Sequence, residues 1–93
     1  MLSKIPIDVE KVGKRELEKE ILRVGIIAEL DAINLYEQMA ELLEDGPIKR
    51  TLLDIAREEK VHVGEFQALL LRIDEEQKKS LEEGTKEVEE LMG

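Results

Sequence analysis

Hydrophobic residues recur every three or four positions along most of the chain, which is the spacing of a helical face. Between residues 15 and 44 no proline occurs, and the apolar positions form two separate stripes. The first stripe comprises Leu22, Ile26, Glu29, Ile33, Tyr36, Met39, Ala40 and Leu43; the second comprises Leu17, Ile21, Val24, Ala28, Leu35 and Leu42. Strict alternation of apolar and polar residues is rare, so the pattern favours helices over strands.

A second helical segment is predicted over residues 48–73, after a break at Asp45-Gly46-Pro47. Glycine suits the C-terminal end of a helix, and proline suits the first turn of the next one. Its apolar face comprises Leu52, Ile55, Ala56, Glu59, His62, Val63, Phe66, Leu69, Leu70 and Ile73. The two segments are therefore expected to form an antiparallel hairpin.

The residues after Ile73 predict a short C-terminal helical tail over residues 75–92. The segment from Asp74 to Gln77 has the pattern of a capping box, which starts helices. Gly84 and Thr85 are expected to interrupt this tail. Residues 1–14, which include Pro6 and Gly13, are expected to form an irregular N-terminal arm of the same single domain.

Two helices of this length cannot bury both stripes of the segment 15–44, because one partner helix covers only one stripe. The predicted fold is therefore all-α: a two-helix hairpin with a C-terminal helix, which dimerises into a four-helix bundle. Gly25 and Gly64 lie mid-helix, where glycine costs up to ~1 kcal/mol relative to alanine. Close approach of neighbouring helices is the expected reason for both.

Three polar residues interrupt the apolar stripes: Glu29 in the first segment, and Glu59 and His62 in the second. A bundle core does not hold unpaired carboxylates without compensation. Glu59 and His62 are three residues apart, so both side chains project to the same side of a helix and can share one metal ion. Glu29 lies 17 residues before Gly46, while Glu59 and His62 lie 13 and 16 after it, so all three reach a similar level of the hairpin.

One Glu plus one Glu-x-x-His pair is half of the ligand set of carboxylate-bridged di-iron bundles. A two-fold dimer would supply the other half by symmetry. Carboxylate and imidazole ligands suit iron, manganese or zinc. A competing hypothesis is a non-catalytic oligomerisation module in which Glu29, Glu59 and His62 form a buried salt-bridge network. A metal-binding chaperone without turnover is a third.

Composition narrows the choice of partners. The chain has 93 residues, no cysteine and a formal net charge of −9, so disulfides and thiolate metal sites are excluded. The negative charge argues against nucleic acid or an anionic membrane surface as partner, and it leaves a cation as the natural ligand. No apolar run approaches the length of a membrane span or a signal peptide, so a cytoplasmic location is expected.

The segments from Ala28 to Tyr36 and from Ala56 to His62 resemble the encapsulated ferritins, half-length ferritin-like proteins that are packaged in encapsulin shells. The resemblance covers roughly residues 15–75 and is closest to the archaeal branch, in which this domain is fused to the shell protein. It implies a ferroxidase that oxidises Fe(II) with O₂ at a di-iron centre between two protomers. It also implies a ring of five dimers and mineral storage inside an encapsulin nanocompartment in the cytoplasm.

The same resemblance assigns roles to individual residues. It makes Glu29, Glu59 and His62 the iron ligands, contributed by both chains, and places Tyr36 near the catalytic centre. Asp31 matches an acidic residue on the path by which metal enters, whereas Ala28 stands where a second such acid is expected. A rubrerythrin-like di-metal peroxidase is the nearest alternative chemistry. No shell-targeting peptide is recognisable between Gly84 and Gly93.

Overall fold

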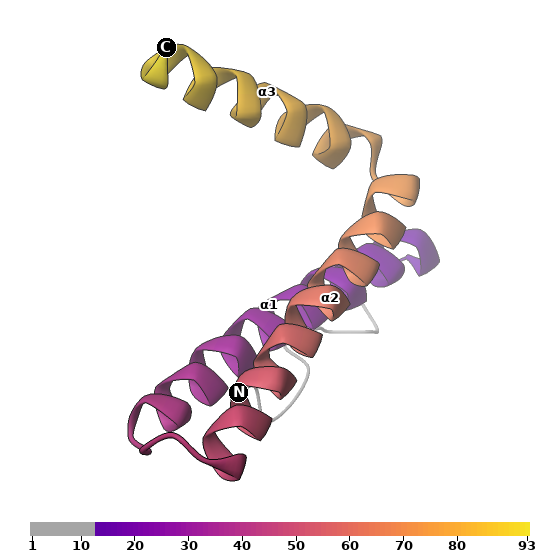
Figure 1. Cartoon of the computed structure of the whole chain (residues 1–93). Coiled ribbons are helices and arrows are strands. Elements are labelled where there is room, and N and C mark those ends of the chain that lie inside the picture. Colours follow the sequence, from indigo (N-terminus) through magenta and orange to yellow (C-terminus); the bar gives the residue numbers. More distant parts are fainter. Residues whose placement is uncertain (1–12) are drawn as a thin grey trace.

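The computed structural model describes residues 13–93, which form three α-helices (Figure 1). Helix α1 spans Lys14–Glu41, α2 spans Pro47–Ile73 and α3 spans Glu75–Met92. No strand occurs in these residues, which confirms the predicted all-α fold. Residues 1–12 of the expected N-terminal arm lie outside the described residues, and Lys14 already belongs to α1.

Helices α1 and α2 pack against each other along their length as an antiparallel hairpin. Small side chains face the seam, since Ala32, Ala40 and Ala56 are all buried. Larger residues beside them close the core only in part, because Ile21, Ile27 and Leu69 remain about half exposed. The described hairpin therefore leaves apolar surface uncovered, as expected for half of a bundle.

The loop between α1 and α2 differs from the prediction in two respects. Helix α1 ends at Glu41 and not at residue 44, because the N–H groups of Leu42 and Leu43 turn to carbonyls three residues back in a tighter turn. Gly46 does not adopt a left-handed helix-ending conformation; its backbone is extended, with φ 170° and ψ 179°. Asp45 accepts two hydrogen bonds from the Arg50 guanidinium, which holds the pKa of this carboxyl below its usual value.

Helix α3 leaves the end of α2 at a sharp angle and projects away from the hairpin (Figure 1). Its first turn is capped by Asp74, whose carboxylate accepts a hydrogen bond from the Gln77 N–H at 3.0 Å. The expected interruption at Gly84 and Thr85 is wrong, because α3 is continuous. One isolated glycine costs too little to break a capped helix, and the Thr85 hydroxyl donates to the Leu81 carbonyl within it.

An ion pair joins α1 to the corner between α2 and α3. Arg23 of α1 donates to the Asp74 carboxylate at 2.8 Å, and the Asp74 side chain is only 8% exposed. This contact joins residues that are 51 positions apart.

None of the described helices is long and apolar enough to cross a bilayer.

Candidate metal centre

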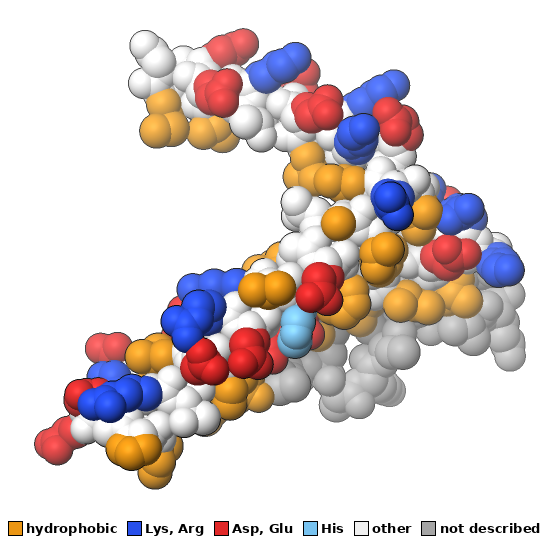
Figure 2. Space-filling model, turned by 45° about the vertical axis from the view of Figure 1, so that its right-hand side comes forward, with side chains coloured by type: hydrophobic (Ala, Val, Ile, Leu, Met, Phe, Trp, Pro, Cys, Tyr) orange, Lys and Arg blue, Asp and Glu red, His pale blue; other side chains and the backbone are white. Residues whose placement is uncertain are grey.

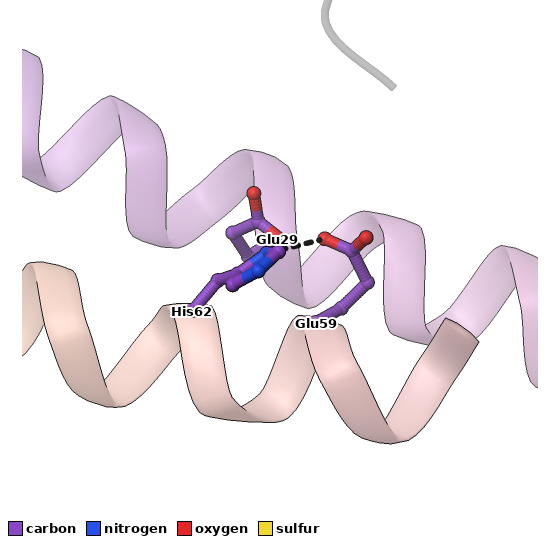
Figure 3. A group of neighbouring side chains, drawn as sticks. All are labelled: Glu29, Glu59 and His62. Atoms are coloured by element: carbon purple, nitrogen blue, oxygen red, sulfur yellow. Dashed lines mark ion pairs between the residues drawn. The ribbon is translucent and has the colours of Figure 1, made fainter. Parts of the chain in front are cut away.

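Glu29, Glu59 and His62 come together in the seam between α1 and α2 (Figure 3). Glu29 projects from α1 and the other two side chains project from α2, three residues apart. One ligand atom from each lies within 4.8 Å of the other two. Antiparallel packing brings residues 29 and 59–62 to one level, as the counting from the loop predicted.

The nitrogen that faces the carboxylates is Nδ1 of His62. It lies 3.4 Å from Oε2 of Glu29 and 3.5 Å from Oε2 of Glu59. Two ligand atoms bound to one ion at about 2.1 Å in a roughly tetrahedral arrangement would be about 3.4 Å apart. The spacing of these atoms therefore fits a shared metal ion as well as it fits an ion pair with a protonated histidine.

The hydrogen bonding of Glu29 separates these two interpretations. Its Oε2 is the one buried side-chain oxygen or nitrogen of the described residues that has no hydrogen-bond partner. The 3.4 Å approach of His62 is an ion-pair distance without hydrogen-bond geometry. A buried carboxylate oxygen without a donor is costly, so a bound cation accounts for this oxygen better than the histidine alone.

The three side chains are reachable from one side of the hairpin. Glu29 and Glu59 are 19% and 18% exposed, while His62 is 44% exposed. Figure 2 shows acidic side chains gathered beside the exposed histidine. Two carboxylates and one imidazole on an accessible face offer oxygen and nitrogen ligands to a divalent or trivalent transition metal.

Tyr36 and Asp31 lie outside this three-residue group. Tyr36 is half-buried on α1, two turns beyond Glu29, which is about 10 Å along the helix axis. Asp31 is also half-buried, and its position two residues after Glu29 turns it to a different side of α1. The structure thus brings the three expected ligands together, while the roles expected for Tyr36 and Asp31 stay predictions.

A neighbour that the stripe analysis did not connect with the site is the pair Gly25 and Phe66. Gly25 lies four residues before Glu29, and Phe66 lies four residues after His62, so both share the faces of the ligands. A Cβ atom on Gly25 would lie only 3.2 Å from the Phe66 ring. In the sequence, the spacing of four residues from each candidate ligand was the signal that could have connected this pair with the site.

A family model described as rubrerythrin matches residues 20–92. The chain is similar to the ferritin-like-encapsulin shell fusion protein of Pyrococcus furiosus, with 59% identity over 87 residues, 94% of this chain and 25% of that protein. It is also similar to the encapsulin nanocompartment cargo protein EncC of Myxococcus xanthus, with 39% identity over 67 residues, 72% of this chain and 51% of that protein. The chain thus spans about a quarter and about half of these two relatives.

Among solved structures, the crystal structure of the encapsulated ferritin domain from Pyrococcus furiosus matches with a TM-score of 0.83 and 55% identity. The match covers 98% of this chain and 93% of that chain. Because nearly the full length of both chains is aligned at high identity, the likeness extends to all three helices and includes the level of the candidate metal ligands.

Proposed function

The chain belongs to the rubrerythrin family, within the encapsulated ferritins, and on this premise we propose that it is a ferroxidase. It takes Fe(II) as substrate and oxidises it to Fe(III) with O₂. Glu29, Glu59 and His62 of two protomers would hold two iron ions between them. The observation that carries the proposal is the buried Oε2 of Glu29, which has no hydrogen-bond donor but lies 3.4 Å from an imidazole nitrogen.

The charges of the proposed site balance when two copies meet. One chain offers two carboxylates and one imidazole, so a two-fold dimer offers four carboxylates to two iron ions. This nearly compensates two or three positive charges per ion. The set is the one that di-iron helical bundles use, with a Glu from each of two helices and a Glu-x-x-His pair from each of the other two.

The uncovered side of the hairpin supports a second copy as the partner. An apolar groove lined by Ile21, Leu22, Leu69 and Ile73 lies between α1 and α2. Leu22 and Leu69 are each seven residues from a ligand, Glu29 and His62, so the groove and the ligands share one face. A second hairpin laid on this face would bury the groove and complete the metal site together.

The reaction removes one electron from each iron. Two Fe(II) ions supply two electrons to one O₂, which takes up two protons and leaves as hydrogen peroxide. Four Fe(II) ions supply four electrons, and O₂ then takes up four protons and leaves as two water molecules. The iron, when bound, supplies the electrons. The residues of the chain hold it in place, and the carboxylates favour Fe(III) over Fe(II) because their negative charge is attracted more strongly by the higher charge.

The names of both relatives refer to encapsulins, one as a fusion with the shell protein and the other as a nanocompartment cargo protein. We propose that this chain likewise acts inside an encapsulin nanocompartment in the cytoplasm, with the shell protein as partner, as a ring of five dimers. Its product Fe(III) would mineralise in the shell. A hairpin with an open ligand face has no internal cavity in which to store a mineral, which is why an enclosing partner is part of the proposal.

The experiment adds Fe(II) to the anaerobic protein, then O₂, and follows oxygen consumption together with the absorbance of Fe(III). We expect Glu29→Ala, Glu59→Ala and His62→Ala each to abolish stoichiometric oxidation while the helix content is retained. Glu41→Ala removes an exposed acid from the same helix as Glu29 and should oxidise iron like the wild type. Equal oxidation rates in all four variants would refute the assignment.

Two other functions predict different results in the same experiment. A rubrerythrin-like peroxidase would oxidise iron faster with hydrogen peroxide than with O₂. An oligomerisation module would consume no oxygen, and its thermal stability would not change when Fe(II) is added. The family match is compatible with the peroxidase. The buried oxygen of Glu29, which accepts no hydrogen bond, favours a bound cation over a purely structural salt-bridge network.

A further inference from the structure

Gly25 and Phe66 make the closest approach that any glycine in the described chain shows to a side chain of another helix. A Cβ atom placed on Gly25 would lie 3.2 Å from Cδ2 and Cε2 of Phe66 and 3.4 Å from its Cγ. Such a distance is shorter than ordinary van der Waals contact between carbon atoms. An alanine at position 25 would therefore force the Phe66 ring, or the helix that carries it, to move.

Gly64 provides a contrast within the same hairpin. It also lies in the middle of a long helix, yet a Cβ atom placed on it would meet nothing within 4 Å. Within the hairpin, the expectation that both glycines permit close helix approach is confirmed for Gly25, and for Gly64 it stays a prediction about the contact with a second copy. Both positions carry the same helix-propensity cost of about 1 kcal/mol, so the contact with Phe66 distinguishes position 25.

The level of the metal ligands is bounded on both sides by small residues. On one side the next turn holds Gly25 against Phe66. On the other side Ala32 lies three residues after Glu29, and Ala56 lies three residues before Glu59; both are buried, at 4% and 1% exposure. The distance between α1 and α2 at the ligand level is thus set from the turns immediately before and after it.

We propose that the Gly25–Phe66 contact is a positioning device that fixes the spacing of α1 and α2 and thereby holds Glu29 in reach of Glu59 and His62. This inference rests on the proposed metal-binding function. Gly25 is about one turn from Glu29, roughly 6 Å along the axis, and an α-helix transmits a displacement over one turn nearly unchanged. Phe66 has the same relation to His62.

The size of the expected effect follows from the tolerance of metal sites. Ligands must be held within about 0.5 Å of their productive positions, and a shift of a few tenths of an ångström at Gly25 uses much of this margin. Residues that orient ligands without touching the metal typically change its affinity by 10–100-fold. We therefore expect a loss of roughly tenfold in metal affinity from one added methyl group.

The test titrates the metal-free protein, in its purified oligomeric form, with Co(II) alone and records the visible absorption spectrum. Gly25→Ala should weaken Co(II) binding about tenfold and change the spectrum, while circular dichroism shows unchanged helix content. Gly64→Ala is the matched control and should bind Co(II) like the wild type. The double variant Gly25→Ala/Phe66→Leu, in which a smaller side chain makes room for the methyl group, should recover most of the lost affinity.

Phe66→Leu alone keeps the proposal testable if Gly25→Ala does not fold. It removes the ring from a hairpin that still contains Gly25, so the ligand level should loosen and Co(II) binding should weaken severalfold. Equal Co(II) affinity and spectra for the wild type, Phe66→Leu and every folded position-25 variant would overturn the positioning role. A wild type that binds Co(II) no better than His62→Ala would instead overturn the proposed metal site itself.

Discussion

Two carboxylates in this chain, the buried Asp74 and the partly buried Glu29, have opposite surroundings. Asp74, at the corner between α2 and α3, accepts hydrogen bonds from the Gln77 N–H at 3.0 Å and from Arg23 at 2.8 Å. Glu29, in the seam between α1 and α2, has a buried oxygen that accepts none. Burial of a carboxylate is costly unless its charge is compensated. Asp74 is compensated by hydrogen bonds from its own chain, whereas Oε2 of Glu29 has Nδ1 of His62 at 3.4 Å but accepts no hydrogen bond.

The difference suggests a criterion by which a structural carboxylate can be distinguished from a proposed metal ligand. The partners of Asp74 lower its pKa, chiefly through the Gln77 N–H and further through Arg23, so it is ionised and satisfied with its own chain alone. Glu29 faces a second carboxylate and an imidazole, which together offer a cation three ligand atoms. Removing the charge of Asp74 should therefore lower stability without changing metal binding, whereas removing the charge of Glu29 should abolish metal binding without lowering stability.

The largest expected difference is the response of Glu29→Gln to metal. This substitution keeps the shape of the side chain and removes its charge, so the metal-free protein should be as stable as the wild type or more so. A saturating metal should raise the wild-type free energy of unfolding by about 2.7 kcal/mol at a concentration 100 times Kd. Glu29→Gln should lose this gain.

Thermal unfolding with and without Co(II) measures both quantities, with Glu41→Gln as the exposed control on the same helix. A large loss of stability in metal-free Glu29→Gln would show that Glu29, like Asp74, is already compensated by the chain. That result would remove the contrast between the two carboxylates and with it the argument for a cation.

Asp74→Ala is expected to have a smaller effect, and the opposite one to Glu29→Gln: it should lower stability and leave metal binding unchanged. It removes the cap of α3 and the ion pair to Arg23, so the first turn of α3 should fray. Hydrogen exchange of the amides after residue 74 should accelerate, while Co(II) affinity stays at the wild-type value because the ligands lie on α1 and α2. A parallel loss of Co(II) binding would mean that the corner also holds the metal site in place.

The smallest effect is the acid response of the same corner. Because the folded-state pKa of Asp74 lies below its ordinary value, its stabilising contribution is complete above the unfolded pKa of about 3.9 and is lost as the pH falls through the lower folded value. Amide protection in α3 should therefore be constant between pH 5 and 7 and decrease only in stronger acid. In Asp74→Asn, amide protection in α3 should not show this decrease in stronger acid.

Much of the hairpin, and the grouping of its candidate metal ligands, could be predicted from the chain alone. The stripes of both long helices and the polar positions within them indicated an all-α hairpin. Counting from the loop then placed Glu29 level with Glu59 and His62, as the structure has them. This succeeds because helical rise is constant and an antiparallel hairpin has a single register once the loop is located.

Features that depend on contacts distant in sequence could not be predicted. The ion pair between Arg23 and Asp74 joins positions 51 apart, and no local pattern indicates it. The continuity of α3 through Gly84 was also missed, because a glycine weakens a helix by a modest amount that capping and neighbouring residues offset. The contact between Gly25 and Phe66 follows from the side-chain conformation of Phe66, which helical periodicity does not specify.

The most direct measurement of the central claim is anomalous scattering at the iron absorption edge from crystals soaked in Fe(II). The account predicts iron peaks within the group of Glu29, Glu59 and His62, with a second copy of the chain supplying the same three ligands across a two-fold axis. Iron found only at exposed acids elsewhere, or a complete ligand set without any peak, would contradict it.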